Sequence, residues 1–346
     1  MASPREPGAP DLLASAEIVV PGEVRSVTPA RGGGNNRVYR VECADRAFAL
    51  KWYPPQDDDR RDRLGVEFAA LRFLERHGVA AVPRAFVADF ERGLGVYEWL
   101  DGAPAEAPDA ADIDAALNFI ATLAALSGRD EAQALAPASA ACLSGRAVVA
   151  QAQARLARLH QVAAAEPELE AFLGQAFAPT LEEIAAWAEA RFARDGLDFE
   201  AELGPAERVL SASDFGFHNA LRRSGGGLVF LDLEYFGWDD PAKLVADFLH
   251  HPGMTLEPGL KRRFLEGAGA VLGERGGFAL RFPILYPLYG LCWCLILLNE
   301  FRPERWRRRA LAGAGDRRRS CARQLDKARR LHANLRESYE TGPCMH

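Results

Sequence analysis

"SASDFGFHNALRRSGGGLVFLDLEYFGWDDP", residues 211–241, places polar and acidic side chains around a short hairpin. The strand "NALRR" leads into the turn "SGGG", and the return strand "LVFLDLEY" is almost wholly apolar. If the turn is centred between its first two glycines, Asn219 faces Asp232, and directly opposed residues carry Cβ atoms about 5 Å apart. An amide oxygen and a carboxylate at that spacing can share one hard cation, and Asp214 in the entering loop can lean over the same point. The hairpin therefore predicts a cation site at its open end.

Asp232 is the most informative residue of this hairpin, because its charge lies between leucines in "LDL". An unpaired charge in an apolar strand is costly, so a metal ion or a cationic side chain is expected beside it. Asn219 also fits a simple turn former. Glu234, two residues beyond Asp232 on the same strand face, is either a second metal or water ligand or a solvent-facing carboxylate. His218 is interpreted as a structural histidine.

The first hundred residues predict a small, mostly antiparallel sheet with one helix. Strands are expected within residues 24–53, followed by a helix over residues 59–77 that stops at Gly78. The segments "VPRAFVADF" and "VYEWLDG" add another strand pair. Alternation within "RAFALKWY" puts Lys51 on one face with two alanines and three large apolar residues on the other.

A glycine-rich turn and this lysine together suggest a phosphate-binding site. The turn "RGGGNN" allows the backbone to approach an anion closely and to donate its N–H groups. Lys51 has room beside it for a flat ligand, because its face otherwise carries alanines, and its ammonium requires an anion. Glu67, at the edge of the apolar stripe of the following helix, is the expected partner of Lys51.

The remainder of the chain is predicted to be helical. Residues 105–199 are rich in Ala, Leu, Glu and Arg with helical periodicity, and helices are expected again from about residue 242. Residues 282–299 carry no charge, but their prolines and glycine favour a buried core helix beginning near Pro287 over a membrane span. The arginine-rich stretch 302–330 is interpreted as a solvated helical face, with a docking patch for an anionic substrate or partner as the alternative.

Length, charge and cysteine usage narrow the class of protein. A chain of 346 residues fits two lobes or domains, and a net charge of −6 argues against a nucleic-acid-binding surface. The six scattered cysteines lack paired metal-binding spacing and are interpreted as reduced thiols of a cytoplasmic protein. The first 23 residues do not resemble a signal peptide and are expected to form a loose leader. No membrane association is expected, and the sequence does not indicate the oligomeric state.

Taken in chain order, these features resemble the protein-kinase-like fold in its aminoglycoside and choline phosphotransferase branch. "GGGNNRVYRV" is similar to the nucleotide loop of that branch, "FALKWY" to its lysine strand, "SDFGFHN" to its catalytic loop and "LDLEYFGWDDPAKLVADF" to its metal-binding strand and following segment. The resemblance covers residues 27–101 and 205–250. It implies an α+β, two-lobed fold: a nucleotide-binding lobe over residues 24–101, after the leader at 1–23, and a larger helical lobe over residues 102–346.

The resemblance also implies roles for particular residues. Asp214 matches the catalytic base, Asn219 and Asp232 match the Mg²⁺ ligands, and Lys51, steadied by Glu67, matches the lysine that contacts the phosphates of ATP. The other nucleotide contacts would come from the glycine-rich turn and from the backbone beside the adenine: Gly32, Gly33, Gly34, Asn35, Asn36, Glu98, Trp99 and Leu100. Asp247 resembles a structural aspartate that braces the catalytic loop.

Two residues of the catalytic loop depart from the family pattern. Ala212 stands where the family usually has a histidine, and Ser213 stands where it usually has a glycine. These changes raise the alternative of a catalytically degenerate, ATP-binding scaffold. Retention of the base, both metal-ligating residues and the lysine argues instead for an active enzyme.

The sequence therefore predicts an ATP- and Mg²⁺-dependent kinase that transfers the γ-phosphate to a hydroxyl of a sugar, amino sugar or amino alcohol. Two other classes fit less of the sequence. A protein kinase requires a long activation loop, but "EYFGWDDP" runs almost at once into a predicted helix. A metal-dependent hydrolase leaves Lys51 and the glycine-rich turn unexplained.

Overall fold

The computed structural model describes residues 11–30, 37–55, 61–254, 256–273, 275–306 and 316–341. The chain divides into two compact units. Unit 1 comprises Met1–Ala105 and Asn219–Phe236, and unit 2 comprises Glu106–His218 and Gly237–His346. The hairpin that contains Asp232 therefore packs with the first hundred residues, although it lies in the second half of the chain.

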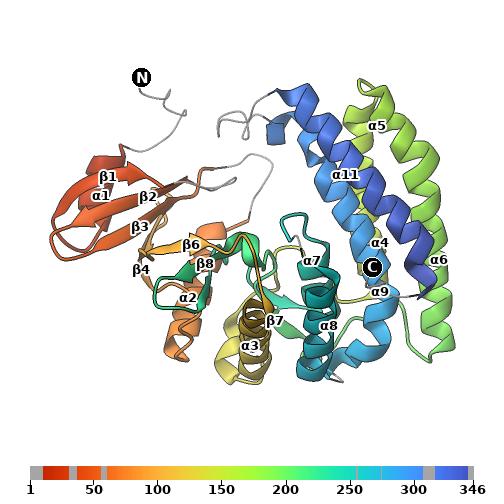
Figure 1. The fold of residues 1–346 in the computed structure, drawn as a ribbon, viewed down its shortest axis with the longest axis horizontal. Coiled ribbons are helices and arrows are strands. Elements are labelled where there is room, and N and C mark those ends of the chain that lie inside the picture. The colour runs from red at the N-terminus through yellow and green to blue at the C-terminus, as the bar shows by residue number, and fades with distance from the viewer. Residues whose placement is uncertain are drawn as a thin grey trace. The chain divides into compact units, whose positions relative to one another are not determined.

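A five-stranded antiparallel sheet forms the centre of unit 1, in the order β1-β2-β3-β5-β4 (Figure 1). Its strands are β1 (Val24–Pro29), β2 (Arg37–Cys43), β3 (Ala47–Trp52), β4 (Ala85–Asp89) and β5 (Leu94–Glu98). The predicted alternation of β3 is confirmed, because Phe48, Leu50 and Trp52 belong to the apolar core of the sheet. Lys51 lies on the opposite face, where Val38 of β2 and Gly95 of β5 are its cross-strand neighbours.

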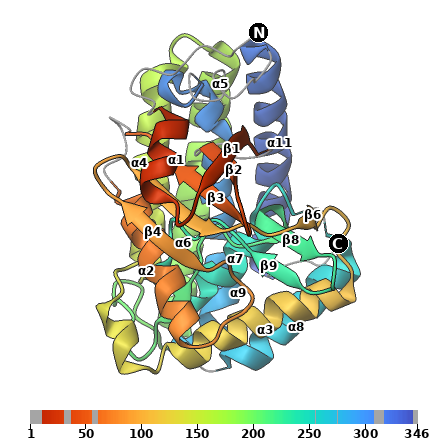
Figure 2. The same cartoon turned by 90° about the vertical axis from the view of Figure 1, so that its left-hand side faces the viewer.

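A short helix, α1 (Leu12–Val19), covers the apolar face of this sheet (Figure 2). The Asp11 side chain caps it by accepting a hydrogen bond from the Ala14 backbone N–H at 3.3 Å. Ala16 and Val19 are buried in the same cluster as Leu50. This part of the chain differs from the loose leader expected over residues 1–23.

The helix α2 (Arg63–Arg76) begins at Asp62, whose side chain accepts a hydrogen bond from the Gly65 N–H at 2.8 Å. Glu67 is buried, with 3% of its surface exposed, while Phe68 is only half-buried. The buried stripe therefore runs through Glu67 rather than Phe68, and the expectation that Glu67 lies at the edge of the stripe is wrong. The buried Glu67 carboxylate is compensated by the ammonium group of Lys51.

The hairpin of unit 1 forms a three-stranded sheet of β6 (Gly102–Pro104), β8 (Ala220–Arg223) and β9 (Leu228–Phe230). Ala220 pairs with Phe230, and the Leu231 N–H donates to the Asn219 carbonyl at 2.8 Å. The predicted register, in which Asn219 faces Asp232, is therefore wrong by one residue. The loop holds three residues, because the Arg223 N–H donates to the Gly227 carbonyl and Gly226 and Gly227 adopt positive φ angles of 88° and 84°.

Unit 2 is mainly helical. Its elements are α3 (Ala110–Leu126), η1 (Asp130–Ala134), α4 (Gly145–Ala163), α5 (Pro167–Ala171), η2 (Phe172–Phe177), α6 (Ala178–Arg194), β7 (Val209–Ser211), β10 (Gly237–Asp239), α7 (Pro241–His250), α8 (Pro258–Leu272), η4 (Arg275–Gly277), α9 (Phe278–Leu297), η5 (Leu298–Phe301), α11 (Arg317–Ser338) and η6 (Tyr339–Thr341), with η3 (Phe217–Asn219) leading into the hairpin. The helix α9 packs against α4, α7 and α11 (Figure 1), and α3 lies beside α8 (Figure 2).

The uncharged segment of the sequence forms most of α9. This helix begins at Phe278, nine residues before the predicted start at Pro287, and it contains both Pro283 and Pro287. Among the described residues one helical stretch, Arg275–Phe301, is long and apolar enough to cross a membrane, and 78% of its apolar window is buried inside the protein. Its neighbours within unit 2 account for its apolar surface, as expected for a core helix.

Candidate active site

The centre of the site in unit 1 is a buried lysine held by two carboxylates. Lys51 Nζ lies 2.6 Å from Glu67 Oε2 and 2.5 Å from Asp232 Oδ1. Strand β3, helix α2 and the segment after β9 each supply one of these residues. The predicted Lys51–Glu67 pair is therefore present, and the cation expected beside Asp232 is this lysine.

The electrostatics of the group keep Lys51 charged. Burial alone would lower the pKa of the lysine, but the carboxylates of Asp232 and Glu67 outweigh it and raise the pKa above its ordinary value. Burial raises the pKa of Glu67, and the ammonium of Lys51 opposes that shift. Because each group compensates another, the three form one unit that depends on all of its members.

Two tyrosines fix the position of Glu67. Tyr53 donates its hydroxyl to Glu67 Oε2 at 2.5 Å, and the hydroxyls of Tyr53 and Tyr97 lie 2.8 Å apart. Tyr97 packs over Gly95, where a Cβ atom would lie 2.4 Å from the tyrosine hydroxyl. Gly95 is therefore required for close approach of the ring. Neither tyrosine was among the sequence-predicted site residues, although Tyr53 comes two residues after Lys51 and Tyr97 directly precedes Glu98.

Asp232 leaves the strand in a constrained backbone conformation. Its φ is +63°, in the left-handed region that residues other than glycine adopt rarely. The return strand ends at Phe230, so Asp232 and Glu234 do not share a strand face, and that expectation is wrong. Glu234 is 1% exposed and lies 3.8 Å from Arg63, so it is not a solvent-facing carboxylate either.

The donors around Asp232 fit a hard divalent cation. Oxygen atoms of Glu67, Asp232 and Glu234 all lie within 4.8 Å of one another. Magnesium prefers such oxygen ligands. Among the three, the Asp232 side chain is the most open, at 34% exposed, whereas Glu67 and Glu234 are buried beside Lys51 and Arg63. Asp232 is therefore the carboxylate of this group that a solvated cation can reach.

The other predicted nucleotide contacts are the glycine-rich turn and residues 98–100. The turn that contains Gly32, Gly33, Gly34, Asn35 and Asn36 lies outside the described residues, so its role stays a prediction. The Glu98 side chain accepts a hydrogen bond from the Arg84 N–H at 3.2 Å. Trp99 donates to Asp101 at 2.9 Å. The side chains of Glu98 and Trp99 are thus held by protein partners, and the contact of residues 98–100 with adenine stays a prediction.

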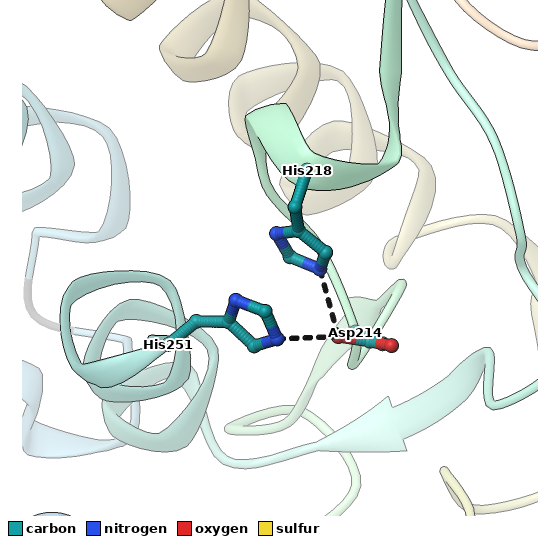
Figure 3. A group of neighbouring side chains, drawn as sticks. All are labelled: Asp214, His218 and His251. Carbon is teal, nitrogen blue, oxygen red and sulfur yellow. Dashed lines mark hydrogen bonds and ion pairs between the residues drawn. The ribbon is translucent and has the colours of Figure 1, made fainter. Parts of the chain in front are cut away.

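The candidate base lies in unit 2, where two histidines contact it (Figure 3). Asp214 Oδ1 lies 3.0 Å from His218 Nε2 and 3.5 Å from His251 Nε2. The two imidazole rings stack with their centroids 3.6 Å apart and their planes 11° apart. His218, interpreted from the sequence as a structural residue, thus contacts the predicted base directly. His251 was missed; its signal is the His–His pair that ends the helix after the "DDP" segment.

The loop before Asp214 carries a second unusual backbone angle. Ser213 has a φ of +60°. The resemblance identified glycine as the usual residue at this position, and the positive φ supplies the physical reason. The backbone therefore adopts the conformation that glycine prefers, with serine in its place. The Ser213 N–H donates to Ser211 Oγ at 3.0 Å, which helps to hold the loop.

Asp247 braces this loop indirectly. Its carboxylate accepts hydrogen bonds from Lys243 at 2.6 Å and from the Trp293 indole at 2.9 Å. The Trp293 ring packs edge-on against His251, with centroids 4.9 Å apart. Asp247 therefore holds Trp293, Trp293 packs against His251, and His251 contacts Asp214.

Comparison with known proteins decides the family. Residues 26–282 match the family model described as the phosphotransferase enzyme family. The chain belongs to that family. It is a phosphotransferase with a protein-kinase-like α+β fold, and the sequence-based expectations of family, fold class and enzyme class are confirmed. None of the curated protein sequences matches this chain.

Solved structures of low sequence identity share the fold. Choline kinase LicA from Streptococcus pneumoniae superposes with a TM-score of 0.59 at 16% identity, over 93% of this chain and 98% of that one. Spectinomycin phosphotransferase APH(9)-Ia, in complex with ADP and spectinomycin, gives 0.63 at 10% identity over 95% and 97%. An ethanolamine kinase from Plasmodium vivax gives 0.55 at 14% identity over 89% and 84%. At these identities the phosphotransferase chains establish the fold of this protein and leave its acceptor open.

Proposed function

We propose that this protein is an ATP-dependent small-molecule kinase that transfers the γ-phosphate to a hydroxyl of a sugar, amino sugar or amino alcohol. The observation that carries the proposal is the buried Lys51, held at 2.6 Å by Glu67 and at 2.5 Å by Asp232 within a phosphotransferase fold. A charged lysine fixed in this way is suited to bind the phosphates of a nucleotide.

Unit 1 is proposed to bind the nucleotide. Lys51 contacts the phosphates, while Glu67 and Tyr53 prevent its side chain from folding away from them. Asp232, with Asn219 at the open end of the hairpin, would hold Mg²⁺. When bound, that ion neutralises charge on the phosphates. The glycine-rich turn and the backbone of residues 98–100 complete the nucleotide site in this proposal.

Unit 2 is proposed to supply the base. Asp214 orients the acceptor hydroxyl and takes its proton as the bond to phosphorus forms. Phosphoryl transfer requires little covalent chemistry from the protein, so correct positioning of this carboxylate is its main contribution. ADP in one phosphotransferase of the same fold agrees with ATP as the donor. The five described cysteines are free, buried thiols, which agrees with a cytoplasmic location.

An ATP-consumption screen tests the proposal. The full-length protein is incubated with ATP and Mg²⁺ and with sugars, amino sugars, amino alcohols or nucleosides one at a time, and ADP release is measured. Acceptor-dependent ADP release that disappears in Lys51→Met supports the kinase. ATP-dependent thermal stabilisation with no acceptor-dependent ADP release across the panel would favour the degenerate scaffold instead.

A further inference from the structure

We propose that His218 and His251 are positioning residues, which hold Asp214 through a hydrogen bond from the His218 ring and a longer polar contact from the His251 ring, both to its Oδ1 atom. This inference rests on the proposed function, because it assigns a role to the surroundings of the proposed base. Ala212, at the position where the family usually has a histidine, carries no group that can do this. The two histidines reach the same carboxylate from later positions in the chain.

The protonation of His251 follows from its hydrogen bonds. The Gly253 backbone N–H donates to His251 Nδ1 at 3.1 Å, so Nδ1 is an acceptor and carries no proton. Burial, together with the neighbouring His218, lowers the pKa of His251 to about 4, against the opposing charges of Asp214 and Asp247. The ring is therefore neutral near pH 7, with its proton on Nε2. The protonated Nε2 lies 3.5 Å from Asp214 Oδ1.

His218 contacts the same oxygen of Asp214. Its Nε2 lies 3.0 Å from Asp214 Oδ1, while its Nδ1 is buried and has no hydrogen-bond partner in the described part of the chain. A buried N–H without an acceptor costs more than a buried lone pair without a donor, so the proton belongs on Nε2. Both Nε2 atoms therefore lie near one oxygen of Asp214, Oδ1.

The same argument separates this cluster from a metal site. Two histidines and one carboxylate with donor atoms within 4.8 Å of one another could in principle bind a metal ion. A metal would need the lone pair of His251 Nε2, and the Gly253 N–H directs that lone pair to Nδ1 instead. Polar contact with the Asp214 carboxylate is therefore the role that the described contacts support.

Paired substitutions distinguish hydrogen bonding from ring packing. His251→Phe keeps a stacked ring and removes the N–H, whereas His251→Gln keeps an N–H donor near the Nε2 position and removes the ring. The same pair applies to His218. His332→Phe is the matched control, because His332 is another buried histidine of unit 2 and packs against Phe172 with centroids 5.5 Å apart.

We expect each Phe variant to lower kcat by ten- to a hundredfold with an ATP KM within twofold of wild type. The Gln variants retain most of kcat, and the control keeps it. Wild-type kcat in the Phe variants, or Gln variants no better than Phe, would overturn the proposal. Nitrogen-15 NMR of the His251 ring gives a test that needs no acceptor: protonated Nε2 and bare Nδ1 are expected, and the opposite tautomer contradicts the role even if the protein proves to be no kinase.

Discussion

Replacing Lys51 tests whether the buried group in unit 1 is a mutually dependent set of charges. Lys51 is 7% exposed and Glu67 is 3% exposed, so solvent screens their ion pair very little. Loss of one partner from a buried pair costs about 3–5 kcal/mol, because the other charge stays buried and uncompensated. Lys51→Met is therefore expected to lower the free energy of unfolding by about 3 kcal/mol or more. The share of Asp232 is smaller, because its side chain is 34% exposed and water can hydrate it.

The double variant supplies the decisive comparison. Glu67→Gln leaves Lys51 paired with Asp232 and is expected to cost about 1–3 kcal/mol. Lys51→Met/Glu67→Gln removes both buried charges, so its cost falls below the sum of the single costs by about 2 kcal/mol. Equilibrium urea denaturation of the full chain measures all three. The exposed Arg72–Glu75 pair on α2 is the control, with an expected coupling below about 0.5 kcal/mol. Costs that add within about 0.5 kcal/mol for Lys51 and Glu67 would refute the reasoning.

Three further predictions follow from single positions. Gly95→Ala places a Cβ atom 2.4 Å from the Tyr97 hydroxyl and is expected to cost about 1–3 kcal/mol in urea denaturation; wild-type stability would contradict the requirement for glycine. Ser213→Gly relieves a φ of +60° and is expected to raise the melting temperature slightly or leave it unchanged, whereas a clear fall would show that serine is needed there. Burial, helped by the charge of Lys261, lowers the pKa of His250 to about 4, although the hydrogen bond to the Tyr286 carbonyl and the charge of Asp247 oppose that shift. Between pH 6.5 and 4 the unfolded chain therefore binds a proton on His250 that the folded chain does not bind. The free energy of unfolding therefore has its full value above pH 6.5 and falls by at most about 3 kcal/mol as the pH drops towards 4. In His250→Gln, the slope of unfolding free energy against pH is expected to decrease by about one proton. An unchanged slope would argue against a neutral buried ring.

The features that sequence could predict depend on short-range periodicity. Alternation in β3 correctly separated Lys51 from Phe48 and its apolar neighbours, because a strand has a period of two whatever surrounds it. The pairing of Lys51 with Glu67 also followed, since a lysine on an open sheet face requires an anion. The family and the fold class that the sequence motifs predicted were also confirmed.

The features that sequence could not predict depend on backbone angles and on packing between distant segments. The hairpin register changed by one residue because three consecutive glycines permit more than one loop, and positive φ at Gly226 and Gly227 selects the three-residue form. The role of His251 was invisible because 37 residues separate it from Asp214, and no local pattern links a helix end to a loop. The early start of α9 was missed because the helix was expected to begin near Pro287, whereas the packing of this buried helix tolerates both Pro283 and Pro287 inside it.

Turnover of Asp214→Asn, measured alongside ATP binding by the same protein, tests the central claim most directly. The substitution keeps the size and hydrogen-bonding capacity of the side chain but removes its ability to accept a proton. We predict that acceptor-dependent ADP release falls by at least about a hundredfold while ATP affinity stays within a few-fold of wild type. Near-normal turnover in Asp214→Asn would contradict the assignment of the base and, with it, the proposed reaction.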